Sequence, residues 1–149
     1  MSRSTGAQPR WADEAVRRLF DAGYRRGGAR GAVIELLDRQ ECALSALEIE
    51  DRLRSSSDRV SRASIYRVLE ELEGLDLVAR LELGAETALF ETVRSDERHH
   101  HHLKCDDCGG IVPFADEELE KVIRRVSKRL PYAVSGHEVT LRGSCANCA

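Results

Sequence analysis

Two cysteine pairs constrain the fold of this chain more than any other feature. Cys105 and Cys108 form one C-x-x-C motif, and Cys145 and Cys148 form a second one at the end of the 149 residues. Each motif is a tight knuckle that presents two thiols, and two knuckles together supply the four ligands of a tetrahedral zinc site. The 36 residues between them (109–144) exceed a zinc-finger spacing, so the second knuckle must return across a folded segment. We predict a structural zinc site; a redox dithiol or two unrelated pairs are the alternatives.

The composition favours a globular protein of the cytoplasm. Hydrophobic residues make up 42% of the chain and charged residues 33%, which is too apolar for a disordered chain. No apolar run approaches the roughly 20 residues that span a bilayer, so no membrane partner is expected. Residues 1–10 lack the apolar core of a secretory signal. In the expected cytoplasmic setting disulfides are disfavoured, which supports the zinc interpretation.

Positive charge gathers in the first 30 residues, although the net charge of the chain is −3. Seven arginines, Arg3 among them, fall in this segment against three acidic residues. The total argues against a generally basic nucleic-acid binder, but the distribution leaves room for a local basic patch. A solubilising arginine-rich surface is the alternative.

The first half of the chain has the pattern of several short helices. Apolar residues recur at helical spacing in residues 11–20 and 29–40. A third helix begins at the capping box of Ser45 and Glu48, and a fourth extends over about residues 61–73. The stripes expected to face the core are Ala12, Val16, Leu19 and Phe20, then Ala32, Val33, Leu36 and Leu37, then Ile65, Val68, Leu69 and Leu72.

The pattern then changes from helical to extended. Residues 77–83 and 87–92 flank Gly84-Ala85-Glu86, which is a hairpin signal. Short helices followed by a two-stranded hairpin describe a helix-turn-helix with a wing, in which residues 62–73 form the second helix. The outward face of this helix would carry Ala63, Tyr66, Arg67 and Glu70. A helix that serves only packing could look the same.

The charged segment 94–98 is predicted to link a winged-helix domain, residues 1–93, to a second domain, residues 99–149. In the second domain we expect strands at about 100–105 and 111–114, a helix at 116–130 and a strand at about 133–142. About 50 residues bury little apolar surface by themselves, so a zinc site and a dimer interface are expected to stabilise this small domain.

Four of the five histidines are consecutive, from His99 to His102, directly before the first knuckle. Because side chains alternate along a strand, His99 and His101 would point to one face. His100 and His102 would point to the other. Each pair needs one or two further ligands, and a solvated histidine run is the alternative. The candidate ligands are Glu91 at the end of the wing, Glu120 on the last helix and His137 in the last strand.

Several of these segments match a known family together. They are residues 61–69 (SRASIYRVL), 89–91 (LFE), 99–109 (HHHHLKCDDCG), 136–137 (GH) and the terminal C-x-x-C. In them the chain resembles the ferric uptake regulator family of metal-responsive repressors, over about residues 19–148. The resemblance implies an α+β chain with an N-terminal winged helix-turn-helix and a small α/β dimerisation domain that holds the four-cysteine zinc site.

The resemblance also implies a role for individual residues. Structural zinc would be held by Cys105, Cys108, Cys145 and Cys148. A sensing site between the domains would consist of Glu91, His100 and His102. A second regulatory site would consist of His99, His101, Glu120 and His137. DNA would be contacted by Arg25, Arg30, Ser64, Tyr66 and Arg67. Of these, Tyr66 and Arg67 would meet base edges in the major groove, and the first two arginines would lie near phosphate or the minor groove.

Some positions depart from the family pattern. Many members supply a histidine to the sensing site where this chain has Ala43; the adjacent Cys42 could replace it and would favour zinc over iron. A buried cysteine packed as a small hydrophobe is the alternative. Pro113 replaces a frequent carboxylate, and Gly27-Gly28 replaces the usual Thr-Pro helix start. Glu91 stands where peroxide-sensing members carry Asp, which disfavours a peroxide sensor.

These observations predict a homodimeric, metal-dependent repressor that controls metal-homeostasis genes from an AT-rich palindromic operator in double-stranded DNA. Its structural metal would be Zn²⁺ and its regulatory metal Zn²⁺ or Fe²⁺; histidine and carboxylate ligands do not choose among zinc, iron and manganese. A zinc-dependent enzyme and a metal-storage or carrier protein are the alternatives. We expect no enzyme, because the chain has no H-E-x-x-H, G-x-S-x-G or P-loop motif. The storage or transport of a metal does not require Tyr66 and Arg67 on the outward face of a helix.

Overall fold

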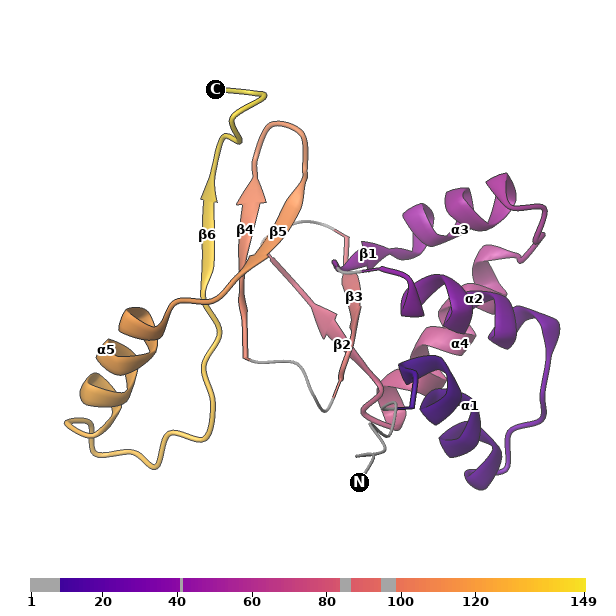
Figure 1. Cartoon of the computed structure of the whole chain (residues 1–149), viewed down its shortest axis with the longest axis horizontal. Coiled ribbons are helices and arrows are strands. Elements are labelled where there is room, and N and C mark those ends of the chain that lie inside the picture. The colour runs from indigo at the N-terminus through magenta and orange to yellow at the C-terminus, as the bar shows by residue number, and fades with distance from the viewer. Residues whose placement is uncertain (1–8, 41, 84–86, 95–98) are drawn as a thin grey trace, which may run out of the picture. The chain divides into compact units, whose positions relative to one another are not determined.

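A computed structural model gives the arrangement of the chain (Figure 1). The structure describes residues 9–40, 42–83, 87–94 and 99–149. The chain divides into two compact units, Met1–Ser95 and Asp96–Ala149. Arg3, the predicted turn at 84–86 and residues 95–98 of the predicted linker lie outside the described residues. Among the described helices, none combines the length and the apolar character that crossing a bilayer requires.

The N-terminal unit contains helices followed by a small sheet. Its elements are α1 (Trp11–Asp21), α2 (Gly28–Asp38), β1 (Leu44–Ser45), α3 (Ala46–Ser55), α4 (Arg62–Gly74), β2 (Val78–Leu81) and β3 (Leu89–Thr92). Strand β3 lies between β1 and β2 and is antiparallel to both. Helices α3 and α4 form the predicted helix-turn-helix, and β2 with β3 forms the wing. The two-residue strand β1 was not predicted, because so short a strand exists only through its pairing with Leu89 and Phe90.

The helix boundaries follow from local chemistry. Ser45 begins α3 with the predicted capping box: its hydroxyl accepts from the backbone N–H of Glu48, and the Glu48 carboxylate accepts from the N–H of Ser45. Ser61 begins α4 by accepting from the N–H of Ser64. These side chains satisfy N–H groups that have no partner within the helix. After α1 the backbone turns at Gly23, whose φ of +93° is readily adopted only by glycine.

The apolar stripes predict most of the core of this unit. The α4 stripe is confirmed, since Ile65, Val68, Leu69 and Leu72 are all buried. In α1 the expected Ala12 and Leu19 are buried and Val16 is partly buried, and Trp11 and Ala15 are buried as well.

The expectation that Phe20 faces the core is wrong, because its side chain is 67% exposed. The buried stripe of α1 is centred on residues 11, 15 and 19, and a residue directly after Leu19 is rotated by about 100° away from it. In α2, Ile34 is buried although the expected stripe left it out, while Ala32 and Leu36 are only partly buried.

The C-terminal unit is a three-stranded sheet with one helix in its described residues. Its elements are β4 (His101–Cys105), β5 (Ile111–Phe114), α5 (Glu117–Ser127) and β6 (Thr140–Gly143). Strand β4 is central, antiparallel to β5 and parallel to β6, and Figure 1 shows the three side by side.

The long last strand predicted at 133–142 is wrong in extent. Residues 131–139 have no regular secondary structure, and pairing with β4 begins where the N–H of His102 donates to the carbonyl of Val139. A parallel strand requires a crossover connection, so this segment is needed to return the chain from α5 to the far edge of β4. Helix α5 also ends at Ser127, three residues before the predicted end.

Candidate metal centres and recognition helix

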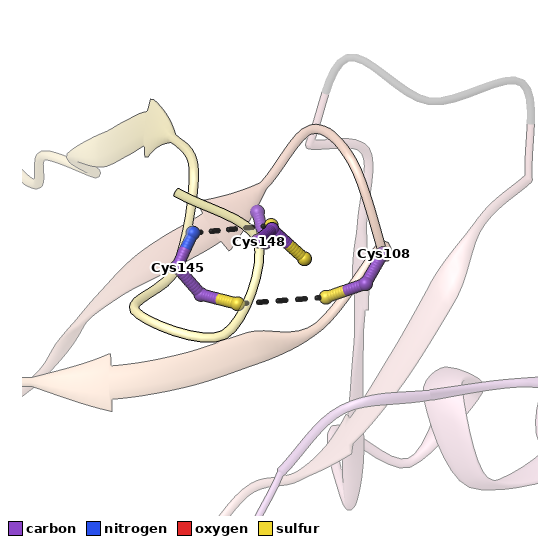
Figure 2. Close-up of side chains that lie close together, drawn as sticks. Cys108, Cys145 and Cys148 are labelled. Atoms are coloured by element: carbon purple, nitrogen blue, oxygen red, sulfur yellow. Dashed lines mark hydrogen bonds between the residues drawn. The ribbon is translucent and has the colours of Figure 1, made fainter.

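The two cysteine knuckles meet at one end of the C-terminal sheet. Cys105 ends β4, and the second knuckle follows β6. Because these strands are parallel, with Cys105 opposite Gly143, both knuckles leave the sheet at the same edge. The four sulfur atoms lie within 4.8 Å of one another. Figure 2 shows the sulfurs of Cys108 and Cys145 facing each other, 3.9 Å apart, with Cys148 beside them.

The distances and the electrostatics of this four-cysteine cluster fit a zinc ion. Zinc–sulfur bonds of about 2.3 Å in tetrahedral geometry place neighbouring sulfurs about 3.8 Å apart. Backbone N–H groups of Cys108 and Cys145 lower the pKa of Cys105 to about 6. The neighbouring thiols of Cys145 and Cys108 raise the pKa of Cys148 to about 12. Four thiolates this close repel one another, and a divalent cation is what would hold all four in the charged form.

The second cluster lies between the start of β4 and α5. The ligand atoms of His99, His101, Glu120 and His137 lie within 4.8 Å of one another. Nε2 of His101 is 2.6 Å from the Glu120 carboxylate, and Nε2 of His137 is 3.1 Å from it. The Nε2 atoms of His99 and His137 are themselves 3.1 Å apart. Zinc–nitrogen bonds of about 2.0–2.1 Å imply ligand separations of about 3.4 Å, so this set is close to a coordination shell.

The protonation states of this cluster also favour a cation. Burial lowers the pKa of His99, and the contact with His101 lowers the pKa of Glu120. A neutral imidazole and an ionised carboxylate are the forms that bind metal. Nδ1 of the buried His101 has no hydrogen-bond partner among the described residues, so its ring makes its hydrogen bond through the Nε2 that faces this cluster.

The predicted alternation of the histidine run is confirmed. The rings of His99 and His101 lie 4.7 Å apart between centroids, and those of His100 and His102 lie 5.1 Å apart on the other face. Glu91, the third member of the predicted sensing set, lies on β3 in the N-terminal unit and is partly buried. Cys42 is also only partly buried, in the segment before β1.

Helix α4 presents its predicted outward face to solvent. Ala63, Tyr66, Arg67 and Glu70 are all exposed, and the Tyr66 side chain is 43% exposed although it is large and aromatic. Ser64 is partly buried at the first turn, where its hydroxyl accepts from Ser61.

The two arginines expected near the DNA backbone differ from each other. Arg25 is exposed, whereas the guanidinium of Arg30 donates to both carboxylate oxygens of Glu71, at 2.6 and 2.8 Å. It also donates to the carbonyl of Arg25 and lies over the ring of Tyr24. The sequence does not predict Glu71 as a partner of Arg30, because the two residues are 41 positions apart, and it does not predict the stacking on Tyr24, because that depends on how the chain turns between α1 and α2.

Comparison with known proteins places this geometry in a family. The model of the ferric uptake regulator family matches residues 21–142. The ferric uptake regulation protein of Vibrio anguillarum is 32% identical over 130 residues, which are 87% of this chain and 86% of that protein. The protein of the same name from Bordetella parapertussis is 32% identical over 131 residues, which are 87% and 93% of the two chains.

Solved structures agree with the sequence relatives. The Vibrio cholerae ferric uptake regulator has a TM-score of 0.77 and 28% identity, covering 87% of this chain and 98% of that one. The Helicobacter pylori ferric uptake regulator, described with three functional metal-binding sites, has a TM-score of 0.79 and 26% identity, covering 95% and 97%. The chain therefore belongs to the ferric uptake regulator family, whose members are transcription regulators rather than enzymes.

Proposed function

We propose that this regulator is a homodimeric repressor whose binding to operator DNA depends on a regulatory metal. The observation that carries the proposal is the arrangement of the histidine run that leads into β4. One pair of imidazoles joins Glu120 and His137 in a converging set, and the other pair occupies the opposite face. Two ligand pairs in one short segment, in addition to a separate four-cysteine cluster, are more than structural stability requires.

The structural metal is proposed to be Zn²⁺, held by the four cysteines. A closed set of four thiolates leaves no coordination position for a substrate, which is typical of a structural site. The regulatory metal is proposed to be Zn²⁺ or Fe²⁺, at Glu91, His100 and His102 and at the His99, His101, Glu120 and His137 set. The Pseudomonas aeruginosa ferric uptake regulator, 26% identical with a TM-score of 0.68, has been solved with manganese. Mixed nitrogen and oxygen ligands accept all of these ions.

DNA recognition is proposed to use α4 in the major groove. Tyr66 and Arg67 are adjacent, exposed and near the N-terminal end of this helix, the part that reaches base edges in helix-turn-helix proteins. Ser64 and Arg25 would add contacts to the backbone or the minor groove. The proposed operator is AT-rich and palindromic, in genes of metal homeostasis, because two identical winged helices read two inverted half-sites.

The dimer is proposed to form through the C-terminal unit. Helix α5 buries none of its residues in the single chain. Val122 and Val126 are 47% and 46% exposed, one helical turn apart, and Leu130 continues the same stripe. On the sheet, Val112 and Leu141 are exposed as well. Exposed apolar side chains in this number are expected to be covered by a second copy.

The deciding experiment measures operator affinity as a function of metal. Protein stripped of its regulatory metal with a mild chelator, but still carrying its cysteine-bound zinc, is titrated against an AT-rich palindromic duplex and a shuffled duplex. Adding Zn²⁺, Fe²⁺ or Mn²⁺ in separate titrations identifies the effective ion. The proposal expects salt-dependent binding that appears only with metal and prefers the palindrome.

The alternatives give different results in that experiment. A storage or carrier protein binds metal without gaining affinity for either duplex. A zinc-dependent enzyme requires an open coordination position and gives no preference for the palindrome. Equal affinity with and without metal would refute metal control and leave a constitutive DNA-binding protein.

A further inference from the structure

A groove between α1 and α2 belongs to none of the sites described above. It is a cavity of about 830 Å³, bounded by the second half of α1, residues 24–27 and the first turns of α2. Small-molecule sites have volumes of about 300–1,000 Å³, so this groove has the size of a ligand site. All of its lining residues belong to the N-terminal unit.

The wall of the groove is apolar and partly aromatic. Val16, Leu19 and Ile34 line it from the two helices, and the rings of Phe20 and Tyr24 add aromatic surface. Phe20 is the residue whose expected place in the core proved wrong, and its 67% exposure leaves a large aromatic side chain beside the groove. Aromatic side chains in this position offer stacking partners to a planar ligand.

The same groove carries uncompensated positive charge. Arg17, Arg25 and Arg26 line it, and none of their guanidinium groups pairs with a described residue. The acidic residue in the lining is Asp13, and Arg30 is already paired with Glu71. Unpaired guanidinium groups beside an apolar wall are suited to a carboxylate, which arginine can bind with two parallel hydrogen bonds.

We propose that this groove binds a small aromatic carboxylate and that its occupant competes with operator DNA. The aromatic body would lie against Phe20 and Tyr24, and the carboxylate would be bound by Arg17, Arg25 and Arg26. The competition rests on the proposed function, since Arg25 is there assigned to the DNA backbone. A guanidinium that binds the ligand can no longer contact the DNA phosphate. The ligand would therefore weaken operator binding by an amount that depends on the ligand concentration.

Gly31 provides a way to fill the groove without removing any of its groups. It lies on α2 in the lining, and a Cβ atom added there would meet no atom within 4 Å. Gly31→Leu therefore places a branched side chain in the groove. Gly31→Ala is the matched control, because it makes the same change in helix propensity and leaves most of the volume open.

The binding test uses 1-naphthoate as the probe and needs neither metal ions nor DNA. Isothermal titration calorimetry on the full chain is expected to show saturable binding of one probe per chain. Gly31→Leu is expected to weaken naphthoate binding about tenfold or more, because the new side chain fills part of the groove. Arg17→Gln is expected to weaken it about as much, because a charge-assisted hydrogen bond is lost. Gly31→Ala should stay within about twofold, and the neutral 1-naphthalenemethanol should bind more weakly. No saturable binding, or unchanged binding to Gly31→Leu, overturns the site.

The competition test adds operator DNA to metal-loaded protein. Naphthoate is expected to raise the apparent Kd for DNA of the wild type and of Gly31→Ala, and to leave that of Gly31→Leu unchanged. Naphthoate binding without any effect on DNA affinity overturns the regulatory part. If Gly31→Leu loses DNA affinity and the wild type binds no naphthoate, the groove serves only DNA, which overturns the proposal. Because the calorimetry is independent of DNA, failure of the repressor proposal and failure of this one remain distinguishable.

Discussion

At the residue scale, Arg30 occupies a position that the family resemblance assigns to DNA contact, and in this structure it also makes contacts within the protein. Its guanidinium joins three parts of the N-terminal unit: Glu71 on α4, the carbonyl of Arg25 and the ring of Tyr24. The hydrogen bonds to Glu71 raise its pKa further above the usual range for arginine. Bound in this way, Arg30 fixes the start of α2 against α4, and its contact with DNA stays a prediction.

Salt dependence separates the two arginines. Arg25→Ala should reduce the slope of log affinity against log salt by about one, because one phosphate contact is lost. Arg30→Ala should lower the affinity for operator while leaving that slope unchanged, because its charge is already neutralised by Glu71. Fluorescence anisotropy at several salt concentrations measures both. An equal loss of slope in the two variants would mean that Arg30 leaves Glu71 for the DNA.

Base reading is tested at Arg67, the arginine of α4 that is proposed to contact a base edge. Arg67→Ala should cost about 1–3 kcal/mol on the operator if the side chain pairs with a base edge. The loss on a shuffled duplex should be much smaller, so the specificity ratio falls. Equal losses on the two duplexes would instead assign Arg67 to a phosphate.

At the element scale, the parallel pair β4 and β6 is what brings the knuckles together. Cys105 lies opposite Gly143, and the second knuckle begins two residues after that position. Strand β6 is four residues long and mostly exposed, and hydrogen bonds from Arg142 to Asp106 and from Ser144 to Asp107 also join the two knuckle segments. Zinc binding and the closure of the sheet are therefore expected to depend on each other.

Removing one thiol tests this dependence. Cys148→Ser should lose the most tightly bound zinc and weaken the dimer, because an incomplete thiolate set no longer stabilises the sheet edge. Zinc content after dialysis and sedimentation analysis measure the two effects. Cys42→Ser is the matched control, which should keep both the zinc of the knuckles and the dimer. A Cys148→Ser dimer with full zinc content would contradict a structural role.

At the scale of the whole molecule, the proposed switch connects metal binding to the spacing of two recognition helices. Glu91 comes from the N-terminal unit, and His100 and His102 come from the C-terminal one. Metal bound by all three would fix the angle between the winged helices of the dimer, which must match half-sites at a fixed spacing. Such a metal acts only if it binds the DNA-competent form more tightly than the other form.

Variants in the two histidine-containing ligand sets test the switch. His100→Ala and Glu91→Ala should give folded, zinc-containing dimers whose DNA affinity no longer responds to metal. His99→Ala and His137→Ala, on the opposite face, should reduce the response less. The coupling, typically about 1–3 kcal/mol, is reciprocal, so operator DNA should tighten metal binding by the same factor. A full metal response in His100→Ala, or metal affinity that ignores DNA, would rule out this site as the switch.

Features that depend on near neighbours in the chain could be predicted from the sequence. The outward face of α4, the caps at Ser45 and Ser61 and the alternation of the histidine run all follow from helix and strand periods, which act over a few residues. The C-x-x-C spacing is equally local, and it predicted a four-ligand site before any fold was known.

Features that depend on which elements pack together could not be predicted from the sequence. The pairing of Arg30 with Glu71 joins residues 41 positions apart, and the indole of Trp11 donates to the carbonyl of Leu77 across 66. The same holds for the late start of the last strand, at Thr140, which the return from α5 to β4 delayed, and for the exposure of Phe20, which the direction of the core determined. Local periodicity specifies a face, but the partner that covers this face is chosen by the packing of the whole unit.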